Sequence, residues 1–271
     1  MSENSYSSQF EPWTTIVNTP ENQPPDKDFW DAKAQLFPRY SPGEHTYEAR
    51  MLALARDMGM DFNGGCVLDI GCGTGMYTLR IAMRARQVFA LDISGRMLQI
   101  LEEDAARLGL PNIQSVRCDW KDYSPLPPCD AVFSSMSPAF KDDASREKLL
   151  KCAGAQVLHI GFTRRMPSDV MAGLYAHFEV VPKEFNDSLL MRQWLASKGL
   201  PHNFREVDDS WDVAWQKDAL AKACALTLQR HGVEEDKTLL ASHIETFRRE
   251  DGLYHEITAF SVGLLFWRNP A

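Results

Sequence analysis

Three glycines and one carboxylate, closely spaced early in the chain, form the strongest chemical signal in the sequence. The apolar run 66–70 contains Asp69, and Gly71, Gly73 and Gly75 follow it directly. Glycines allow a tight backbone turn and let a ligand approach without a Cβ in the way. A helix that begins at such a turn presents free amides and the positive end of its dipole, which favours a carboxylate or another anion. The pattern predicts a ligand-binding loop.

Two classes of ligand use glycine loops of this kind. Dinucleotide enzymes prefer G-x-G-x-x-G, in which the pyrophosphate lies at the start of the helix. That register needs a glycine at position 76, where this chain has Met76. Asp69 also fits poorly beside a pyrophosphate but well beside an ammonium group. S-adenosylmethionine carries an ammonium and a carboxylate and no phosphate, so the loop favours this ligand.

Short buried strands alternate with helices around and after the loop. Such alternation predicts βαβ units and a mainly parallel sheet. Ser94 is expected to cap the helix that ends before Gly109. The predicted strands cover 66–70, 88–92, 113–119, 130–136 and 156–162, and the predicted helices cover 75–85, 94–108 and 142–153.

The last hundred residues continue the pattern less regularly. We expect helices at 168–178 and 186–198, a strand at 203–213, helices at 217–231 and 235–249, and a final antiparallel strand at 255–267. The helical stretch at about 217–250 is interpreted as an insertion before the last strand. Trp211 and Trp215 flank it, and we interpret them as anchors of the insertion, with a roof over an acceptor pocket as the alternative.

The N-terminal residues 1–40 are predicted to form a flexible arm, and 41–271 to form the main domain. The first part is polar and rich in proline, a composition that buries little, and order is expected to begin near Phe29. Ser41 resembles the start of a capping box, with Pro42 at the first helical position.

The segment from Val67 to Gly75 resembles the first motif of the class I S-adenosylmethionine-dependent methyltransferases. The resemblance covers about residues 40–165. It implies an α/β, Rossmann-like, doubly wound fold with a mainly parallel seven-stranded sheet and an antiparallel last strand. Inserted cap helices are not a general feature of the family. Asp69 and the three glycines would hold the methionine portion of S-adenosyl-L-methionine.

Further residues match the family in order. Asp92, at the end of the second strand, corresponds to the acid that binds the ribose hydroxyls. Asp119 corresponds to the acid beside the adenine ring, with a turn-capping role as the alternative, and Trp120 would pack on that ring. Ser135 lies where family members line the active site. Tyr40, in a segment that covers the cofactor in many relatives, is a candidate contact to the methionine end.

Charge and motif both favour a small-molecule acceptor. The chain has 29 Lys plus Arg against 37 Asp plus Glu, a net charge of -8, and its basic residues are scattered. Proteins that bind nucleic acid usually pool positive charge. The segment Ser137-Pro138-Ala139-Phe140 matches only in part the Pro-Pro motif of enzymes that methylate amino groups of nucleic acids. A nucleic-acid acceptor is therefore disfavoured, and Phe140 is expected either to stack on a flat acceptor or to pack.

The sequence identifies neither a catalytic base nor a metal site. Methyl transfer from a sulfonium needs alignment and exclusion of water more than a strong base. His159 lies in a predicted strand and is interpreted as a core residue. The six cysteines show no CxxC pair, the start does not resemble a secretory signal, and no apolar run is long enough to cross a bilayer. A cytoplasmic protein with reduced thiols, not associated with a membrane, is expected.

These observations predict a methyltransferase acting on a small metabolite, with its oligomeric state left open. Three alternatives remain: a nicotinamide-dependent oxidoreductase, a non-catalytic cofactor-binding protein, and a methyltransferase of RNA or DNA. S-adenosylhomocysteine should stabilise the protein where NAD does not, if the main interpretation holds. Turnover on a metabolite would exclude the second alternative. Salt-sensitive binding to RNA or DNA would indicate the third.

Overall fold

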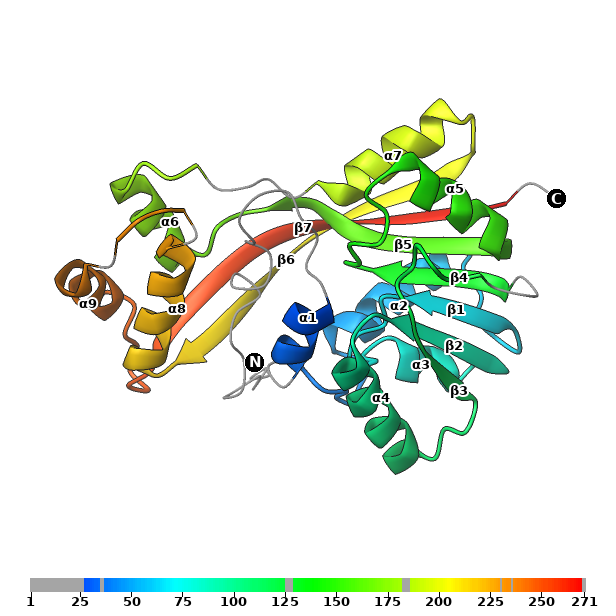
Figure 1. The fold of residues 1–271 in the computed structure, drawn as a ribbon, viewed down its shortest axis with the longest axis horizontal. Coiled ribbons are helices and arrows are strands. Elements are labelled where there is room, and N and C mark those ends of the chain that lie inside the picture. The colour runs from blue at the N-terminus through cyan, green and yellow to red at the C-terminus, as the bar shows by residue number, and fades with distance from the viewer. Residues whose placement is uncertain are drawn as a thin grey trace. The chain divides into compact units, whose positions relative to one another are not determined.

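A computed structural model describes residues 27–34, 37–124, 129–181, 186–229, 231–234 and 236–269. Its centre is a seven-stranded sheet with the order β3-β2-β1-β4-β5-β7-β6 and an antiparallel β7 (Figure 1). The strands are β1 (Cys66–Ile70), β2 (Gln87–Asp92), β3 (Ile113–Arg117), β4 (Cys129–Ser135), β5 (Ala153–Arg165), β6 (His202–Trp215) and β7 (Tyr254–Arg268). The predicted α/β class and strand arrangement are confirmed.

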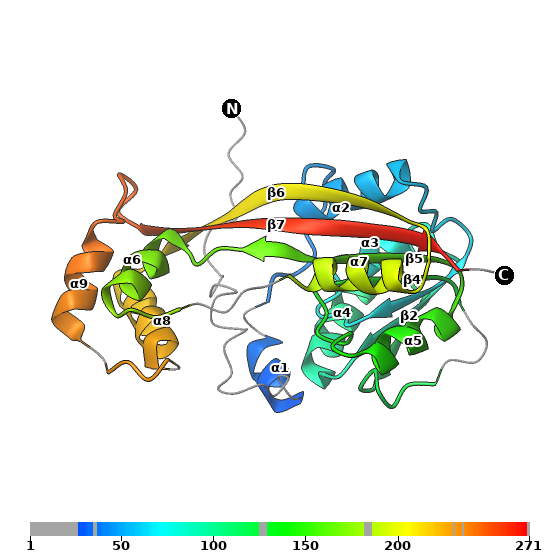
Figure 2. The same cartoon turned by 90° about the horizontal axis from the view of Figure 1, so that it is seen from above.

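Nine helices lie between or before the strands within the described residues. They are α1 (Lys27–Lys33), α2 (Tyr47–Asp57), α3 (Thr78–Ala82), α4 (Gly95–Leu108), α5 (Asp143–Cys152), α6 (Asp169–His177), α7 (Asp187–Ser197), α8 (Lys217–Gln229) and α9 (Lys237–Glu245). Figure 2 shows α2 on one face of the sheet and α5 and α7 on the other. The helix expected over 75–85 is shorter, because the glycine loop runs on to Tyr77.

Successive side chains of a strand point to opposite faces of the sheet, so the central strands contribute to two cores. On β1, Leu68 belongs to the hydrophobic cluster that also contains Leu149 of α5 and Trp194 of α7. On β2, Ala90 belongs to a second cluster with Leu79 of α3 and Leu101 of α4. The central strands are therefore buried on both faces, which agrees with their nearly continuous apolar sequence.

The glycine loop lies at the point in the sheet where the strand order reverses. β1 pairs in parallel with β2 on one side and with β4 on the other. Chain order runs from β1 outward to β3 and then crosses back to β4. At such a switch point the loops after neighbouring strands diverge, and ligands bind outside the carboxyl ends of the strands. The loop after β1 and the residues that end β4 meet there.

The caps of two helices show where local sequence signals hold and where they fail. Ser94 caps α4 by accepting a hydrogen bond from the Met97 amide at 3.1 Å, and Gly109 ends that helix with φ of 66°, as expected. The capping box at Ser41 is wrong. α2 begins after Thr46 instead, whose hydroxyl accepts from the Ala49 amide at 3.3 Å.

The chain forms two compact units, and each has a core of its own. The larger unit comprises Asp26–Thr163, Asn186–Val207 and Val262–Ala271, and the smaller unit includes Arg164–Phe185 and Asp208–Ser261. Helices α8 and α9 lie in the smaller unit, which also contains α6 and the adjoining parts of β6 and β7. This unit is therefore larger than the predicted insertion at 217–250.

The core of the smaller unit combines apolar packing with a buried carboxylate. Leu174 of α6, Leu228 of α8 and Ile244 of α9 share one cluster. Trp215 is buried there too, and its indole nitrogen donates to Glu256 Oε2 at 3.1 Å. This position agrees with an anchoring role.

Among the described residues, we find no helix with the length and hydropathy needed to cross a membrane.

Candidate cofactor and acceptor site

The glycine loop makes a tight turn at the carboxyl end of β1. Gly71, Gly73 and Gly75 have φ values of 75°, 55° and 86°, in the left-handed region that favours glycine. The amides of Gly71 and Cys72 both donate to the Leu91 carbonyl, at 2.8 and 3.1 Å. The loop is thereby fixed to the end of β2.

The glycines of the loop meet different surroundings. A Cβ on Gly71 would lie 2.8 Å from the Cβ of Ser137, and one on Gly75 would lie 3.2 Å from Cγ of Leu101. Both glycines are required by close packing. A Cβ on Gly73 would meet nothing within 4 Å. The backbone at Gly73 therefore borders open space, where a ligand can approach.

Asp92 ends β2 and holds the loop through its side chain. One carboxylate oxygen accepts from the Gly73 amide at 2.8 Å, and the other accepts from the Ser94 amide at 2.8 Å. Burial raises the pKa of this carboxyl, and the two backbone amides oppose that rise. An ionised carboxylate has about four acceptor positions, so further positions remain for hydroxyl groups of a ligand.

Asp69 is buried beneath the loop. Only 1% of it is exposed, and the Thr78 hydroxyl donates to its carboxylate at 2.6 Å. Burial raises the pKa of Asp69 to about 7, and the negative charge of Asp92 adds to the rise. A ligand would thus meet the loop backbone before it met this carboxylate. The predicted contact between Asp69 and an ammonium group stays a prediction.

Asp119 and Trp120 lie after β3 and have different surroundings. One oxygen of Asp119 accepts from the Lys121 amide at 3.0 Å, and the other lies 3.3 Å from Lys121 Nζ. This is the turn-capping geometry of the alternative interpretation, although the side chain is still 35% exposed. Trp120 is only 5% exposed, and its indole donates to the Ser145 carbonyl at 3.2 Å. Little of its ring is left for an adenine to contact.

The end of β4 carries the only positive φ in a non-glycine residue of the larger unit within the described residues. Met136 has φ of 49°, and its amide donates to the Ile160 carbonyl at 2.7 Å. Such conformations cost about 1–3 kcal/mol and cluster at functional sites. Ser135 is half-buried immediately before it, and Ser137 immediately after it lies against Gly71. The sequence predicted Ser135 here but carried no signal for the strain at Met136.

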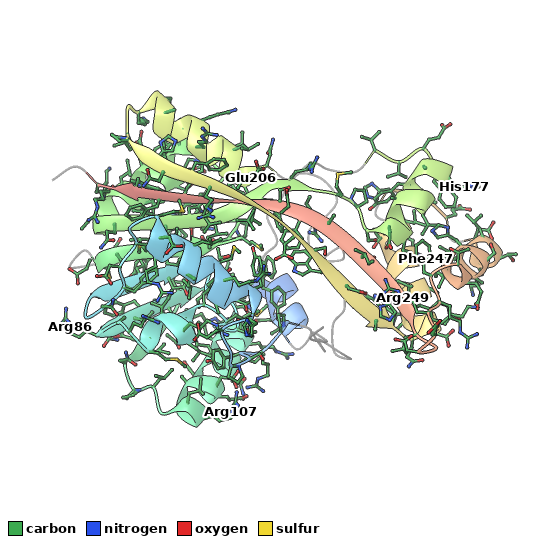
Figure 3. All side chains as sticks on the ribbon, turned by 180° about the vertical axis from the view of Figure 1, so that it is seen from behind. Arg86, Arg107, His177, Glu206, Phe247 and Arg249 are labelled. Atoms are coloured by element: carbon green, nitrogen blue, oxygen red, sulfur yellow. The ribbon has the colours of Figure 1, made fainter. Side chains whose placement is uncertain are left out.

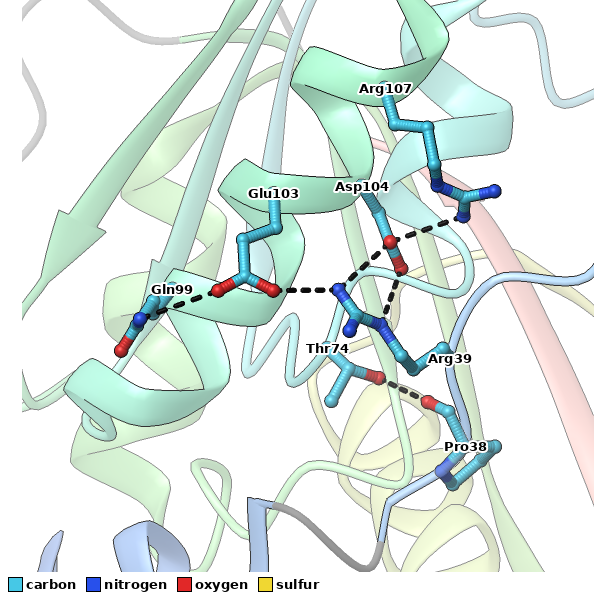
Figure 4. Close-up of polar contacts among 7 residues, drawn as sticks. All are labelled: Pro38, Arg39, Thr74, Gln99, Glu103, Asp104 and Arg107. Carbon is cyan, nitrogen blue, oxygen red and sulfur yellow. Dashed lines mark hydrogen bonds and ion pairs between the residues drawn. The ribbon is translucent and has the colours of Figure 1, made fainter. Parts of the chain in front are cut away.

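The N-terminal segment is attached to the loop and to α4. The Thr74 hydroxyl donates to the Pro38 carbonyl at 2.6 Å, and Arg39 contacts Glu103 and Asp104 at 2.9 and 3.0 Å (Figure 4). Tyr40 lies beneath a guanidinium, with Cζ of Arg80 5.1 Å from its ring centroid. The residues of the predicted arm that are described, 27–34 and 37–40, are therefore bound to the domain.

Asp31 adds a further attachment that the sequence gave no reason to expect. Its carboxylate accepts from the Ser94 hydroxyl at 2.6 Å and from the Arg96 amide at 3.2 Å. Helix α1 thus lies over the start of α4. The contacted residue Ser94 follows Asp92 closely in the sequence. Its apolar side packs with Met97 and Ile100 of α4. The remaining parts of the predicted arm, residues 1–26 and 35–36, lie outside the described residues.

Comparisons with known proteins identify relatives of this chain. A model of a methyltransferase domain matches residues 67–159. An uncharacterised protein of Haemophilus influenzae is 30% identical over 192 residues, which cover 69% of this chain and 68% of that protein.

Solved structures show the same fold at low identity. A putative methyltransferase of Bacillus halodurans has a TM-score of 0.54 at 15% identity, covering 82% of this chain and 99% of its own. Magnesium protoporphyrin IX methyltransferase of Synechocystis, solved with bound S-adenosylhomocysteine, has a TM-score of 0.50 at 12% identity, covering 88% and 96%.

Proposed function

Because the chain belongs to the class I S-adenosylmethionine-dependent methyltransferases, we propose that it methylates a small-molecule acceptor. The family assignment makes the protein a methyltransferase that uses S-adenosyl-L-methionine. This cofactor supplies a methyl group on an activated sulfonium. The protein's own task is to align the acceptor and exclude water. Which acceptor it uses, and which residues hold the cofactor, are the proposals argued below.

The open space at Gly73, next to the Asp92 carboxylate, is the observation that carries the cofactor site. The backbone at Gly73 has no side chain and no neighbour where a Cβ would lie. Asp92 is fixed by two backbone amides and keeps free acceptor positions. We propose that Asp92 binds the ribose hydroxyls and that Gly71, Gly73 and Gly75 adjoin the methionine portion. The acceptor positions of Asp92 and the open position at Gly73 support this assignment.

Asp69 is proposed to act on the cofactor through its charge. A carboxylate in a low-dielectric interior attracts a cation several times more strongly than one in water. Because the pKa of Asp69 is raised to about 7, the carboxyl is partly protonated at neutral pH. A cationic ligand beside it would favour the ionised form. Asp119 is proposed to lie beside the adenine region and Tyr40 near the methionine end, while Ser135 borders the reacting centre. A role for Trp120 at adenine would require its ring to be uncovered.

The charge distribution supports a small acceptor rather than a nucleic acid. The net charge of -8 opposes association with a polyanion. Within the larger unit, Arg86 precedes β2 and Arg107 lies on the last turn of α4, and Figure 3 shows them on separate parts of the surface. Arg107 is also paired with Asp104 at 3.1 Å. The acceptor is therefore proposed to be a metabolite.

Two further proposals concern the setting of the protein. All six cysteines are free, which supports a cytoplasmic location, where thiols stay reduced. We also propose that residues 41–271 form the methyltransferase domain, against which the described residues 27–34 and 37–40 pack, and that the helices at about 217–250 are an insertion in it.

Calorimetric titration with S-adenosylhomocysteine tests the cofactor site. We expect heat of binding with the unaltered protein and a loss of at least tenfold in affinity with Asp92→Ala. Asp57→Ala, at the exposed end of α2, is the matched control and should bind as the unaltered protein does. Unchanged affinity in Asp92→Ala would overturn the proposed ribose contact.

A second experiment identifies the acceptor. Metabolite extract and total RNA are incubated separately with the enzyme and methyl-labelled cofactor, and mass spectrometry locates the label. Label in a small metabolite supports the proposal. Label in RNA alone, or no label in either fraction from a protein that binds S-adenosylhomocysteine, contradicts it.

A further inference from the structure

Two cysteine thiols contact each other at the amino-terminal ends of neighbouring strands. Cys66 is the first residue of β1 and Cys129 the first residue of β4, and the two strands pair in parallel. The Cys66 thiol donates to the Cys129 sulfur, and the two Sγ atoms are 3.0 Å apart. A disulfide bond is about 2 Å long, so the two atoms need to approach by only about 1 Å to form one.

The backbone around the two thiols holds them in this position. Neighbouring strands lie about 4.8 Å apart, and the Cα atoms of a disulfide are usually about 4.4–6.8 Å apart, so paired strands suit such a bridge. The Cys66 amide donates to Asp130 Oδ2 at 2.7 Å, which fixes the start of β1 beside the start of β4. Both side chains also face one core, because Cys129 belongs to the hydrophobic cluster of Leu68 and Cys66 packs against that cluster.

The two thiols differ in their access to solvent. Cys129 is only 1% exposed, and burial raises the pKa of its thiol well above the ordinary value, with Cys66 and the Asp130 carboxylate adding to the rise. Cys66 is half-buried and closely follows the exposed residues Asn63 and Gly64. An oxidant in solution would therefore meet Cys66 first. The Cys129 thiol lies in position to react next with the oxidised sulfur.

Other cysteines of the chain have different surroundings. Cys118 is also half-buried, but its thiol contacts the Asp119 carbonyl at 3.3 Å. Cys224 is buried in the core of the smaller unit. Cys152 is buried in the same hydrophobic cluster as Cys129. These differences make Cys118 a matched control and Cys152 a competing partner for Cys129.

We propose that Cys66 and Cys129 are a peroxide-sensitive thiol pair that closes to a disulfide within the native fold. This inference goes beyond the proposed methyl transfer and does not depend on it. Disulfides in cytoplasmic proteins are usually transient and redox-sensing. Exchange with a cellular dithiol would reduce the bond and restore both thiols.

The chemistry needs only a hydroperoxide as the oxidant. The sulfur of Cys66 attacks the peroxide, the O–O bond breaks, and a sulfenic acid forms while hydrogen peroxide leaves one water. The Cys129 thiol then attacks that sulfur, so that the S–S bond forms and the S–OH bond breaks. A second water leaves with the proton of Cys129. In total, the two thiols lose two electrons and two protons to the peroxide.

The disulfide should stabilise the larger unit without reaching the cofactor loop. It would join residues that are 63 positions apart, and a cross-link that closes a long loop restricts the unfolded chain. The thiols lie at the amino ends of β1 and β4, whereas the glycine loop follows the carboxyl end of β1. We expect oxidation to raise the urea midpoint of unfolding by at least about 0.5 M.

Thiol counting and disulfide mapping test the proposal. Reduced protein is treated with hydrogen peroxide, the remaining thiols are alkylated with N-ethylmaleimide in denaturant, and the protein is digested without reductant. The number of free thiols should fall from six to four. Mass spectrometry should find the peptide of Cys66 joined to that of Cys129, and dithiothreitol should restore both thiols.

Three variants separate the two steps. Cys129→Ser removes the second thiol, so the sulfenic acid on Cys66 should persist and react with dimedone. Cys66→Ser removes the first thiol, so every remaining thiol should stay reduced and Cys129 should carry no dimedone. Cys118→Ser is the matched control and should lose two thiols and gain urea resistance as the unaltered protein does.

Several results would overturn the proposal. They are six free thiols after a peroxide treatment that fully oxidises free cysteine in the same solution, a disulfide between Cys129 and Cys152, or a sulfinic acid on Cys66 without a cross-link. An equal or lower urea midpoint in the oxidised protein would also overturn it, because the bond would then not fit the native fold.

Discussion

In the cofactor-free protein, replacing Asp69 with asparagine should become more stabilising as the pH rises. The pKa of this carboxyl rises from 3.8 to about 7 on folding because of burial. Between these values the folded state binds more protons than the unfolded state, so stability falls as pH rises. Asp69→Asn removes a group that becomes charged in the interior.

The magnitude follows from the pKa change. One unit corresponds to about 1.4 kcal/mol, so the ionised carboxylate costs about 4 kcal/mol of folding free energy at about pH 8 and less than about 2 kcal/mol at about pH 5. The asparagine oxygen can still accept from Thr78, but its new amide donors can cost about 1–3 kcal/mol if they find no partner. That cost is the same at both pH values, so the difference of about 2.5 kcal/mol survives it.

Denaturation by urea at the two pH values measures the effect. The free energy of unfolding of Asp69→Asn, relative to the unaltered protein, should be about 2.5 kcal/mol more favourable at pH 8 than at pH 5. Asp57→Asn, an exposed change on α2, is the control and should show no such difference. A gain in unfolding free energy for Asp69→Asn that does not vary with pH would refute the argument that Asp69 becomes charged in the interior as pH rises.

Three other substitutions test the packing and caps described above. Gly75→Ala should lower the free energy of unfolding, measured with urea, by about 2 kcal/mol or more, because its φ is 86° and the new Cβ would press on Leu101. Gly109→Ala is the comparison: its φ is 66° but the space around it is open, so the loss should be only about 1 kcal/mol. Ser94→Ala should cost about 1–2 kcal/mol by the same measure, because it removes the cap of α4; an unchanged midpoint would show that the cap is not formed. Glu256→Gln should gain stability relative to the unaltered protein as pH rises from 4.5 towards 7, since burial raises the pKa of this carboxyl to about 7; a gain that does not vary with pH would contradict that burial.

The sequence predicted the features that depend on local chemistry. The alternation of apolar runs and helices was enough for the order of elements, because each buried strand is marked by its own residues. The left-handed turns at Gly71, Gly73 and Gly75 were predictable for the same reason, since few other residues adopt them. The acid at Asp92 was predictable because it ends a strand next to that loop.

Features that depend on long-range contacts were missed. Arg80 donates both to the Ser41 carbonyl at 2.6 Å and to the Thr46 hydroxyl at 2.7 Å, and nothing near residue 41 in the sequence reveals it. The contact between Cys66 and Cys129 arises because β1 pairs with β4, although the two cysteines are 63 residues apart. Periodicity identified both strands but not this contact.

The attachment of α1 and Pro38 has a practical consequence for where the protein can be shortened. A truncated protein that starts at residue 41, the predicted start of the main domain, would lack the Asp31 carboxylate that accepts from the Ser94 hydroxyl and the Pro38 carbonyl that accepts from the Thr74 hydroxyl. It would also uncover Met97 on α4. We therefore expect the folding unit to start upstream of Asp31, and a tag or fusion partner is better placed before that residue than at residue 41.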